Sequence, residues 1–312
     1  MKRAFLAMVL LVAGCGGGGT AAARTEAVTV TNCGAEVTFE RTPERVVLLK
    51  SAAVPYLHDL GVLDRVTARA GQYPEEYYDA ATLAELDRIP LLTDRTDTSG
   101  HLQISQEAVL GQQPDLVLGE VDNLSRDALS AVGIPLLEEP ALCDTTGARP
   151  AFDDIYAQLR MYGKVFDRGE QATAAIDALE QRMSGSTAAI GKTAAVLYPT
   201  VGGGVTYAYG NRSMADPQLK AAGLTNVFGD TDERVFEVTT EELLGRNPDI
   251  LILLYSDGDP KAVARAVTGL PGAKNLTAVR NGDVLPQLFN FTEPPSPLAV
   301  TGLERIVQRF GK

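Results

Sequence analysis

The chain has no tryptophan, two histidines and three cysteines among its 312 residues. His58 and His101 alone leave little for imidazole acid–base chemistry or for a histidine-rich metal site. The sequence also lacks Gly-x-Ser-x-Gly, His-Glu-x-x-His and any cysteine–histidine pair at catalytic spacing. These absences argue against an enzyme and against a resident metal ion.

Basic residues are also scarce, with 28 Lys and Arg against 40 Asp and Glu and a formal net charge of −12. Nucleic acid is therefore not expected as a partner. The stretch 185–193, GSTAAIGKT, looks like a phosphate-binding loop, but it has five residues rather than four between its glycines. It also follows a helical segment and precedes a strand, the reverse of the usual order, and we interpret it as a linker.

The N-terminus has a basic start followed by an apolar run that is too short to span a membrane in the mature protein. Residues 1–14 are predicted to be a signal peptide, and the sequence before Cys15 resembles the bacterial lipobox. An ordinary signal peptide with a chance cysteine is the alternative. We expect lipidated Cys15 to anchor an exported protein to the outer face of the cytoplasmic membrane, with residues 15–31 as a flexible tether.

Two further cysteines, Cys33 and Cys143, are expected to form a disulfide in an oxidising compartment. This disulfide would connect the first predicted strand to the end of the N-terminal half of the chain.

A repeated stretch gives the best structural unit. Residues 105–119, SQEAVLGQQPDLVLG, correspond in register to residues 239–253, TTEELLGRNPDILIL, 134 positions later. Ser105 and Thr239 are suited to cap a helix, a proline ends it, and an apolar run predicts a buried strand. A repeat at this distance indicates two similar lobes.

The chain is predicted to be α/β, with helices alternating with mostly parallel strands. We place the N-terminal lobe at residues 32–150, a helical connector at 151–190 and the C-terminal lobe at 191–312. Gly163 and Gly169 are expected to interrupt the connector, and one helix from Gly169 would run between the lobes. Residues 200–213 are predicted to be a glycine-rich loop.

Several short motifs in order resemble the bacterial solute-binding lipoproteins of ferric-siderophore, haem and cobalamin uptake, in the iron-siderophore branch. They are Asn32-Cys33-Gly34, Val37-Thr38-Phe39, PERVVLL at 43–49, the LxxLGxxDRV pattern at 57–66, and both repeat units. The resemblance implies a class III periplasmic binding protein: two Rossmann-like lobes joined by one long helix, with a ligand cleft between them. The implied partners are an ABC permease dimer and its cytoplasmic ATPase, with the binding protein acting as a monomer.

In the cobalamin-binding members of this family, one glutamate on each lobe pairs with arginines of the permease. Glu107 and Glu241, each seven residues before a Pro-Asp pair, match those positions. The alternative is that each merely stabilises its helix through the dipole, by about 0.3–1 kcal/mol.

Ligand contacts are expected from loops that follow strands. The predicted ligand-binding residues are Lys50, Tyr73, Glu120, Tyr207, Tyr209, Arg212, Arg234, Phe236, Tyr255 and Phe291. Phe236 and Phe291 stand where family members often have tryptophan. The expected ligand is an iron(III)–siderophore complex, which arrives chelated and requires neither cofactor nor metal ligands from the protein. Haem or cobalamin, a surface-anchored enzyme, and an interaction lipoprotein with a degenerate cleft are the alternatives.

Overall fold

The computed structural model describes residues 26–97, 101–143 and 149–311. The predicted signal peptide, Cys15 and most of the predicted tether lie outside the described residues. Within the described ranges, no helix has both the length and the apolar character needed to cross a membrane.

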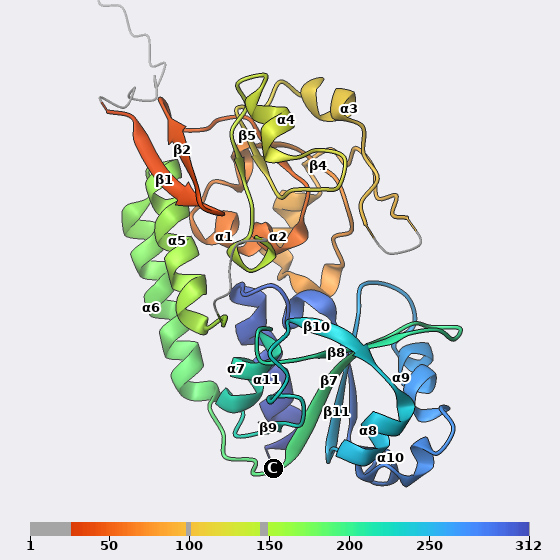
Figure 1. The fold of residues 1–312 in the computed structure, drawn as a ribbon. Helices are drawn as coiled ribbons and strands as arrows, with labels where there is room; N and C mark the ends of the chain where they lie inside the picture. The colour runs from red at the N-terminus through yellow and green to blue at the C-terminus, as the bar shows by residue number, and fades with distance from the viewer. Residues whose placement is uncertain (1–25, 98–100, 144–148, 312) are drawn as a thin grey trace, which may run out of the picture.

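The N-terminal lobe is built on a parallel four-stranded sheet of order β4-β3-β5-β6, beside which an antiparallel β1–β2 hairpin lies (Figure 1). Its strands are β1 (Val28–Asn32), β2 (Ala35–Phe39), β3 (Val46–Leu48), β4 (Val66–Arg69), β5 (Leu116–Leu118) and β6 (Leu136–Leu137). Its helices are α1 (Val54–Asp59), α2 (Ala80–Leu86), α3 (Gln106–Leu110) and α4 (Arg126–Ser130), with 3₁₀ turns η1 (Ser51–Ala53), η2 (Leu63–Arg65), η3 (Glu75–Tyr77) and η4 (Pro140–Leu142).

The C-terminal lobe has a mixed sheet of order β10-β8-β7-β11-β12, with β9 paired to β7. Its strands are β7 (Thr193–Pro199), β8 (Thr206–Tyr209), β9 (Thr225–Asn226), β10 (Val235–Val238), β11 (Ile250–Tyr255) and β12 (Val284–Leu288). Its helices are α7 (Ala215–Ala221), α8 (Thr240–Arg246), α9 (Pro260–Thr268), α10 (Thr277–Asn281) and α11 (Pro297–Phe310), with 3₁₀ turns η5 (Ala273–Asn275) and η6 (Phe289–Phe291). The predicted α/β class with mostly parallel sheets is confirmed.

The prediction that residues 200–213 form a loop throughout is wrong. Within this range, β8 pairs antiparallel with both β7 and β10. The reason is local: Thr206, Tyr207 and Tyr209 are strand-favouring residues, and they follow the glycines that make the turn.

Two helices form the connector, α5 (Phe152–Phe166) and α6 (Gly169–Ser186), which lie side by side along one edge of the molecule (Figure 1). Eighteen residues give α6 a length of about 27 Å, enough to reach from one lobe to the other. The break falls at Asp167, whose left-handed φ of 57° ends α5. Gly163 lies inside α5, so its predicted break is wrong; a Cβ there would come 2.7 Å from the Ala172 side chain of α6.

Both repeat units fold as predicted. The Ser105 hydroxyl accepts a hydrogen bond from the Ala108 N–H at 3.1 Å, and the Thr239 hydroxyl accepts one from the Glu242 N–H at 3.1 Å. These bonds satisfy N–H groups that the first turns of α3 and α8 leave without helical partners. Each unit continues into a buried strand, β5 or β11.

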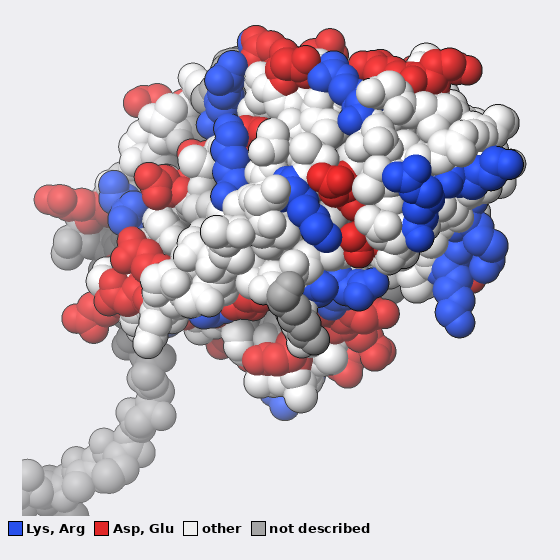
Figure 2. Space-filling view, turned by 90° about the horizontal axis from the view of Figure 1, so that it is seen from below, with Lys and Arg blue, Asp and Glu red and all other residues white. Residues whose placement is uncertain are grey.

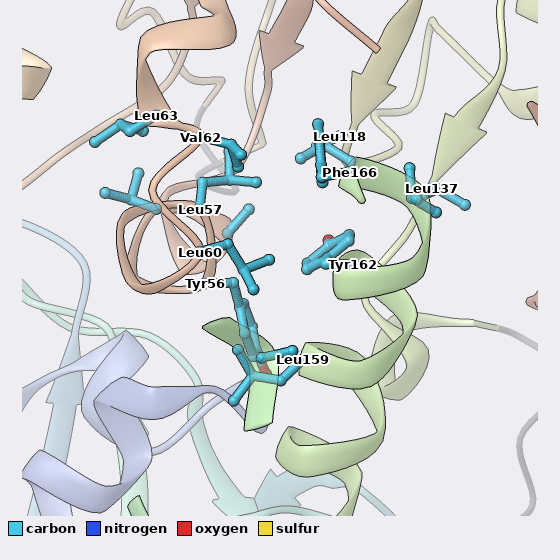
Figure 3. Packing of buried hydrophobic residues seen from close by; sticks show 14 of the residues in the cluster. Tyr56, Leu57, Leu60, Val62, Leu63, Leu118, Leu137, Leu159, Tyr162 and Phe166 are labelled. Carbon is cyan, nitrogen blue, oxygen red and sulfur yellow. The ribbon is translucent and has the colours of Figure 1, made fainter. Parts of the chain in front are cut away.

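The largest hydrophobic cluster of the described residues lies in the N-terminal lobe and the connector and extends into the C-terminal lobe. Tyr56 of α1 packs edge-on against Tyr162 of α5 at 5.6 Å between ring centroids, within a cluster of aliphatic side chains (Figure 3). Met214, Ala299 and Val300 of the C-terminal lobe belong to the same cluster. The two lobes therefore share part of one core.

Candidate ligand-binding site between the lobes

A cavity of about 830 Å³ lies between the two lobes. Its N-terminal wall is formed by segments that follow β3, β4, β5 and β6, which all end at the same edge of a parallel sheet. Its C-terminal wall is formed by Arg234, Ser256, Phe289, Asn290 and Pro294. The strand-end rule therefore places this cavity where a ligand site is expected.

Direct contacts join the lobes beside the cavity. The Tyr56 hydroxyl donates to the Pro295 carbonyl at 3.0 Å, and the Asn290 N–H donates to the Tyr77 hydroxyl at 2.9 Å. The Tyr77 ring also packs edge-on against Phe291 at 5.1 Å. These bonds hold the two walls at a fixed separation in this state.

Glu138 organises the polar part of the N-terminal wall. Its carboxylate accepts hydrogen bonds from Lys50 Nζ at 2.6 Å, from the Glu120 N–H at 2.7 Å and from the Glu139 N–H at 2.5 Å. Asn32 fixes its backbone by bonding to both the Glu138 N–H and its carbonyl, each at 2.8 Å. Glu138 is only 2% exposed, so it positions Lys50 and Glu120 from behind the surface.

The predicted disulfide between Cys33 and Cys143 is present, with the two Cα atoms 5.2 Å apart. Both cysteines line the cavity. Cys33 directly follows Asn32, so the disulfide ties the β1–β2 hairpin to the same wall that Asn32 supports.

Glu139 lies beneath this wall and has a very different environment from Glu138. It is 3% exposed, and its Oε2 atom is buried without a hydrogen-bond partner. Burial raises its pKa from 4.5 to about 8; the neighbouring Glu138 adds to the rise, and Lys50 opposes it. The Glu139 carboxyl is therefore predominantly uncharged at neutral pH.

Arg234 supplies the cation of the opposite wall. Its Nε and Nη2 donate to Glu293 Oε2 at 3.0 and 2.9 Å, and the Met214 N–H donates to Glu293 Oε1 at 2.6 Å. Glu293 is fully buried. Burial raises the pKa of Glu293, whereas the Arg234 guanidinium opposes that rise.

Three predicted ligand residues, Lys50, Glu120 and Arg234, line the cavity. Arg212 lines a second cavity of about 520 Å³ and pairs with Asp232 at 2.7 Å. The other six predicted ligand residues do not line the main cavity: Tyr73, Tyr207, Tyr209, Phe236, Tyr255 and Phe291. The structure thus brings only part of the predicted set together.

Contacts within each lobe explain where five of those six side chains go. Tyr73 donates to backbone carbonyls of Leu48 and Ala70 within the N-terminal lobe. Tyr209 and Phe291 are 4% and 1% exposed in the core. Phe236 packs edge-on against Phe228 at 5.5 Å, and Tyr255 is half-buried beside the C-terminal core.

The remaining one, Tyr207, is 37% exposed on β8.

Sequence reasoning missed Glu138, Arg126 and Asn290. Glu138 follows the two-residue strand β6, so the strand-end rule could have selected it if that short strand had been recognised. Glu138 contacts Lys50, which lies 88 residues earlier in the sequence, and no local sequence pattern predicts a pairing at that distance.

One group in the described part of the chain has the composition of a metal site. Potential ligand atoms of Asp97, His101 and Asp122 lie within 4.8 Å of one another, but all three residues are exposed. The His101 ring nitrogen Nδ1 already lies 3.0 Å from Asp122. Because exposed carboxylates often gather without an ion, we assign no metal to this group.

The predicted docking residues occupy equivalent places in the two lobes. Glu107 lies in the first turn of α3 and Glu241 in the first turn of α8, and both are exposed. Within the described ranges, neither carboxylate forms an ion pair. The two helices lie in opposite lobes, on the side of the molecule away from α6 (Figure 1).

The surface charges are mixed at the end of the molecule formed by the C-terminal lobe. Figure 2 shows Lys and Arg side chains gathered toward one edge and interrupted by Asp and Glu on the face in view. The face in view therefore does not present the continuous basic surface that a nucleic acid would require.

Two α/β lobes, a helical connector and a cavity at the strand ends define a solute-binding protein. The chain belongs to the periplasmic binding protein family, which matches residues 46–286. The resemblance predicted from the sequence is thereby confirmed.

Three of the similar proteins illustrate the family. The structure described as an ABC-type Fe3+-hydroxamate transport system from Saccharomonospora viridis is 56% identical, with a TM-score of 0.87, covering 91% of this chain and 99% of that chain. A cobalamin-binding protein of Halobacterium salinarum is 25% identical over 88% of this chain and 71% of its own length. An uncharacterized ABC transporter substrate-binding lipoprotein of Bacillus subtilis is 21% identical over 98% of this chain and 94% of its own length.

Proposed function

We propose that the protein is a lipid-anchored extracytoplasmic receptor that captures an iron(III)–siderophore complex between its lobes and delivers it to an ABC importer. The observation that carries this proposal is the inter-lobe cavity of about 830 Å³, which lies in the 300–1,000 Å³ range typical of small-molecule sites. The hydroxamate transport description of the relative at 56% identity supports iron as the cargo.

The wall chemistry suits a chelate whose surface is rich in oxygen atoms. Arg234 and Lys50 can donate hydrogen bonds to ligand oxygens, and Phe289 and Tyr77 add apolar surface. The iron would enter fully coordinated by its chelator, so the protein acts as a binder rather than an enzyme. Cobalamin is the second candidate, favoured by the name of the relative at 25% identity.

The test is a binding panel read by native mass spectrometry and calorimetry. It contains a ferric trihydroxamate, a ferric tricatecholate, haem and cobalamin. We expect one molecule of ferric chelate per protein with micromolar or tighter affinity. Binding of cobalamin or haem without binding of any ferric chelate would overturn the assignment.

Delivery would use Glu107 and Glu241 as docking groups, one for each half of a permease dimer. The protein would act as a monomer held at the membrane by lipidated Cys15, so that diffusion toward the permease is confined to the membrane surface. Both glutamates are exposed in the first turn of a capped helix.

Charge reversal tests this docking role. The pair Glu107→Arg and Glu241→Arg is expected to abolish uptake of the labelled ferric chelate in cells while leaving its affinity for the purified protein unchanged. The matched control reverses Glu36 and Glu237, one exposed strand residue from each lobe. Normal uptake by the first pair, or equal loss of uptake by the control pair, would contradict the docking role.

A further inference from the structure

Two cations that line the cavity each carry a buried counter-charge. Lys50 Nζ lies 2.6 Å from Glu138, and the Arg234 guanidinium lies 2.9 Å from Glu293. The lysine and arginine side chains are 28% and 31% exposed, whereas the side chains of both glutamates are buried. Buried glutamates thus neutralise the charges of Lys50 and Arg234 without any ligand.

The hydrogen bonds to both glutamates come from donors. Glu293 accepts from Arg234 and from the Met214 N–H, and Glu138 accepts from Lys50 and from two backbone N–H groups. Every one of these partners is a donor. A protonated carboxyl would have to turn its own O–H toward a donor, so the carboxylate is the form that fits.

The third cation of the wall, Arg126, is occupied by the protein as well. Its guanidinium donates to the Leu136 carbonyl and to Asn32 Oδ1, each at 2.6 Å. Its backbone N–H donates to Glu120 at 3.3 Å, which holds a carboxylate at the cavity beside it.

The charges around the cavity therefore do not favour an anion. Among the described residues of the wall, three cations, Lys50, Arg126 and Arg234, stand against three lining carboxylates, Glu120, Asp122 and Glu138, and against Glu293 directly behind Arg234.

We propose that the cavity selects ferric chelates that carry no net negative charge, and that Glu138 and Glu293 enforce this selection by neutralising Lys50 and Arg234. This inference rests on the proposed function and narrows its substrate class. Iron(III) cancels the charges of three hydroxamates, so such a chelate is neutral, or cationic when it bears a free amine. Ferric tricatecholates retain negative charge and would be disfavoured.

A matched ligand series isolates the charge. A linear ferric trihydroxamate with a terminal amine, its N-acetyl derivative and its N-succinyl derivative share one iron centre but carry net charges of +1, 0 and −1. Calorimetry at low ionic strength is expected to give comparable Kd values for the first two and an about tenfold higher Kd for the third. Raising the salt concentration should reduce that ratio in the unaltered protein, because screening weakens the repulsion.

The two glutamates are tested by Glu138→Gln and Glu293→Gln. Each variant removes one negative charge and is expected to lower the Kd of the anionic chelate about tenfold relative to the neutral one. Glu304→Gln is the matched control, because Glu304 also pairs with an arginine, Arg182, but at the α6–α11 contact outside the cavity. The salt series keeps the inference testable if a variant does not fold.

The outcomes separate the two proposals. If all three chelates bind with equal affinity at every salt concentration, or if the anionic chelate binds best, the charge selection is refuted and siderophore binding stands. If Glu138→Gln and Glu293→Gln change the ratio no more than Glu304→Gln does, their enforcing role is refuted. If none of the three chelates binds but the ferric tricatecholate does, the charge selection is refuted; if no ferric chelate binds at all, the proposed function itself is refuted.

Discussion

Replacing Glu139 with glutamine is expected to stabilise the protein, and to do so more strongly as the pH rises. The Glu139 carboxyl is 3% exposed, its Oε2 has no hydrogen-bond partner, and burial raises its pKa to about 8. Above its ordinary pKa of 4.5, the unfolded chain releases this proton while the folded protein still holds it. The free energy of unfolding therefore falls with rising pH between about 4.5 and about 8.

The size of the effect follows from the same two pKa values. Each unit of difference corresponds to about 1.4 kcal/mol. At pH 6 the unaltered protein should have lost about 2 kcal/mol relative to pH 4.5, and at pH 8 and above about 5 kcal/mol as an order of magnitude. Glutamine has nearly the same shape and no proton to release, so the Glu139→Gln variant should not show this loss.

Urea denaturation of both proteins at half-unit steps from pH 4.5 to pH 9 measures the difference. At pH 4.5 the folded protein holds the proton and the unfolded chain has released it from only half of the molecules, so the value there is the nearest in the series to the exchange of carboxyl for amide alone and serves as the internal reference. A difference that stays constant across the series, or that shifts in favour of the unaltered protein as the pH rises, would refute the assignment of Glu139 as a buried neutral acid.

Two further predictions concern stability. Replacing Cys33 and Cys143 by serine removes a disulfide whose cysteines are 110 residues apart. The chain-entropy model predicts a loss of about 4–5 kcal/mol in the free energy of unfolding, which urea denaturation measures. A variant as stable as the oxidised protein would contradict this prediction. Gly302→Ala would put a Cβ 1.7 Å from the Phe291 carbonyl oxygen, so a melting temperature lowered by many degrees is expected. The control Gly245→Ala adds a methyl group in α8 with no atom within 4 Å, and it should leave stability unchanged or raise it by about 1 kcal/mol; equal effects of the two alanines would refute the packing argument.

Local chemistry was enough to predict the elements that depend on it. The capped helices that begin after Ser105 and Thr239 follow from short-range hydrogen bonds, and the apolar runs that follow them can only be buried strands. The glycine-rich stretch misled the prediction, because β8 exists only through its pairing with β7 and β10. Pairing partners far along the chain are invisible in a local window.

In the binding site too, features set by nearby residues could be predicted and features set by distant residues could not. Lys50 and Glu120 were found because each closely follows a buried strand, which a sequence can indicate, whereas Arg234 directly precedes β10. Tyr209 and Phe291 were predicted from their side-chain type, but whether an aromatic ring faces a cavity or the core is set by packing with distant residues. Glu138 and Glu293 contact their cations across 88 and 59 residues, so only the folded chain brings these charges together.

The shared core between the lobes has a consequence for how the chain loses its structure. Met214, Ala299 and Val300 of the C-terminal lobe are buried in the cluster that fills the N-terminal lobe, so a lobe produced alone would expose this apolar surface to water. Thermal unfolding should then proceed as one cooperative transition rather than as two separate ones. Recombination that exchanged one lobe for that of a distant relative would have to replace this contact surface at the same time.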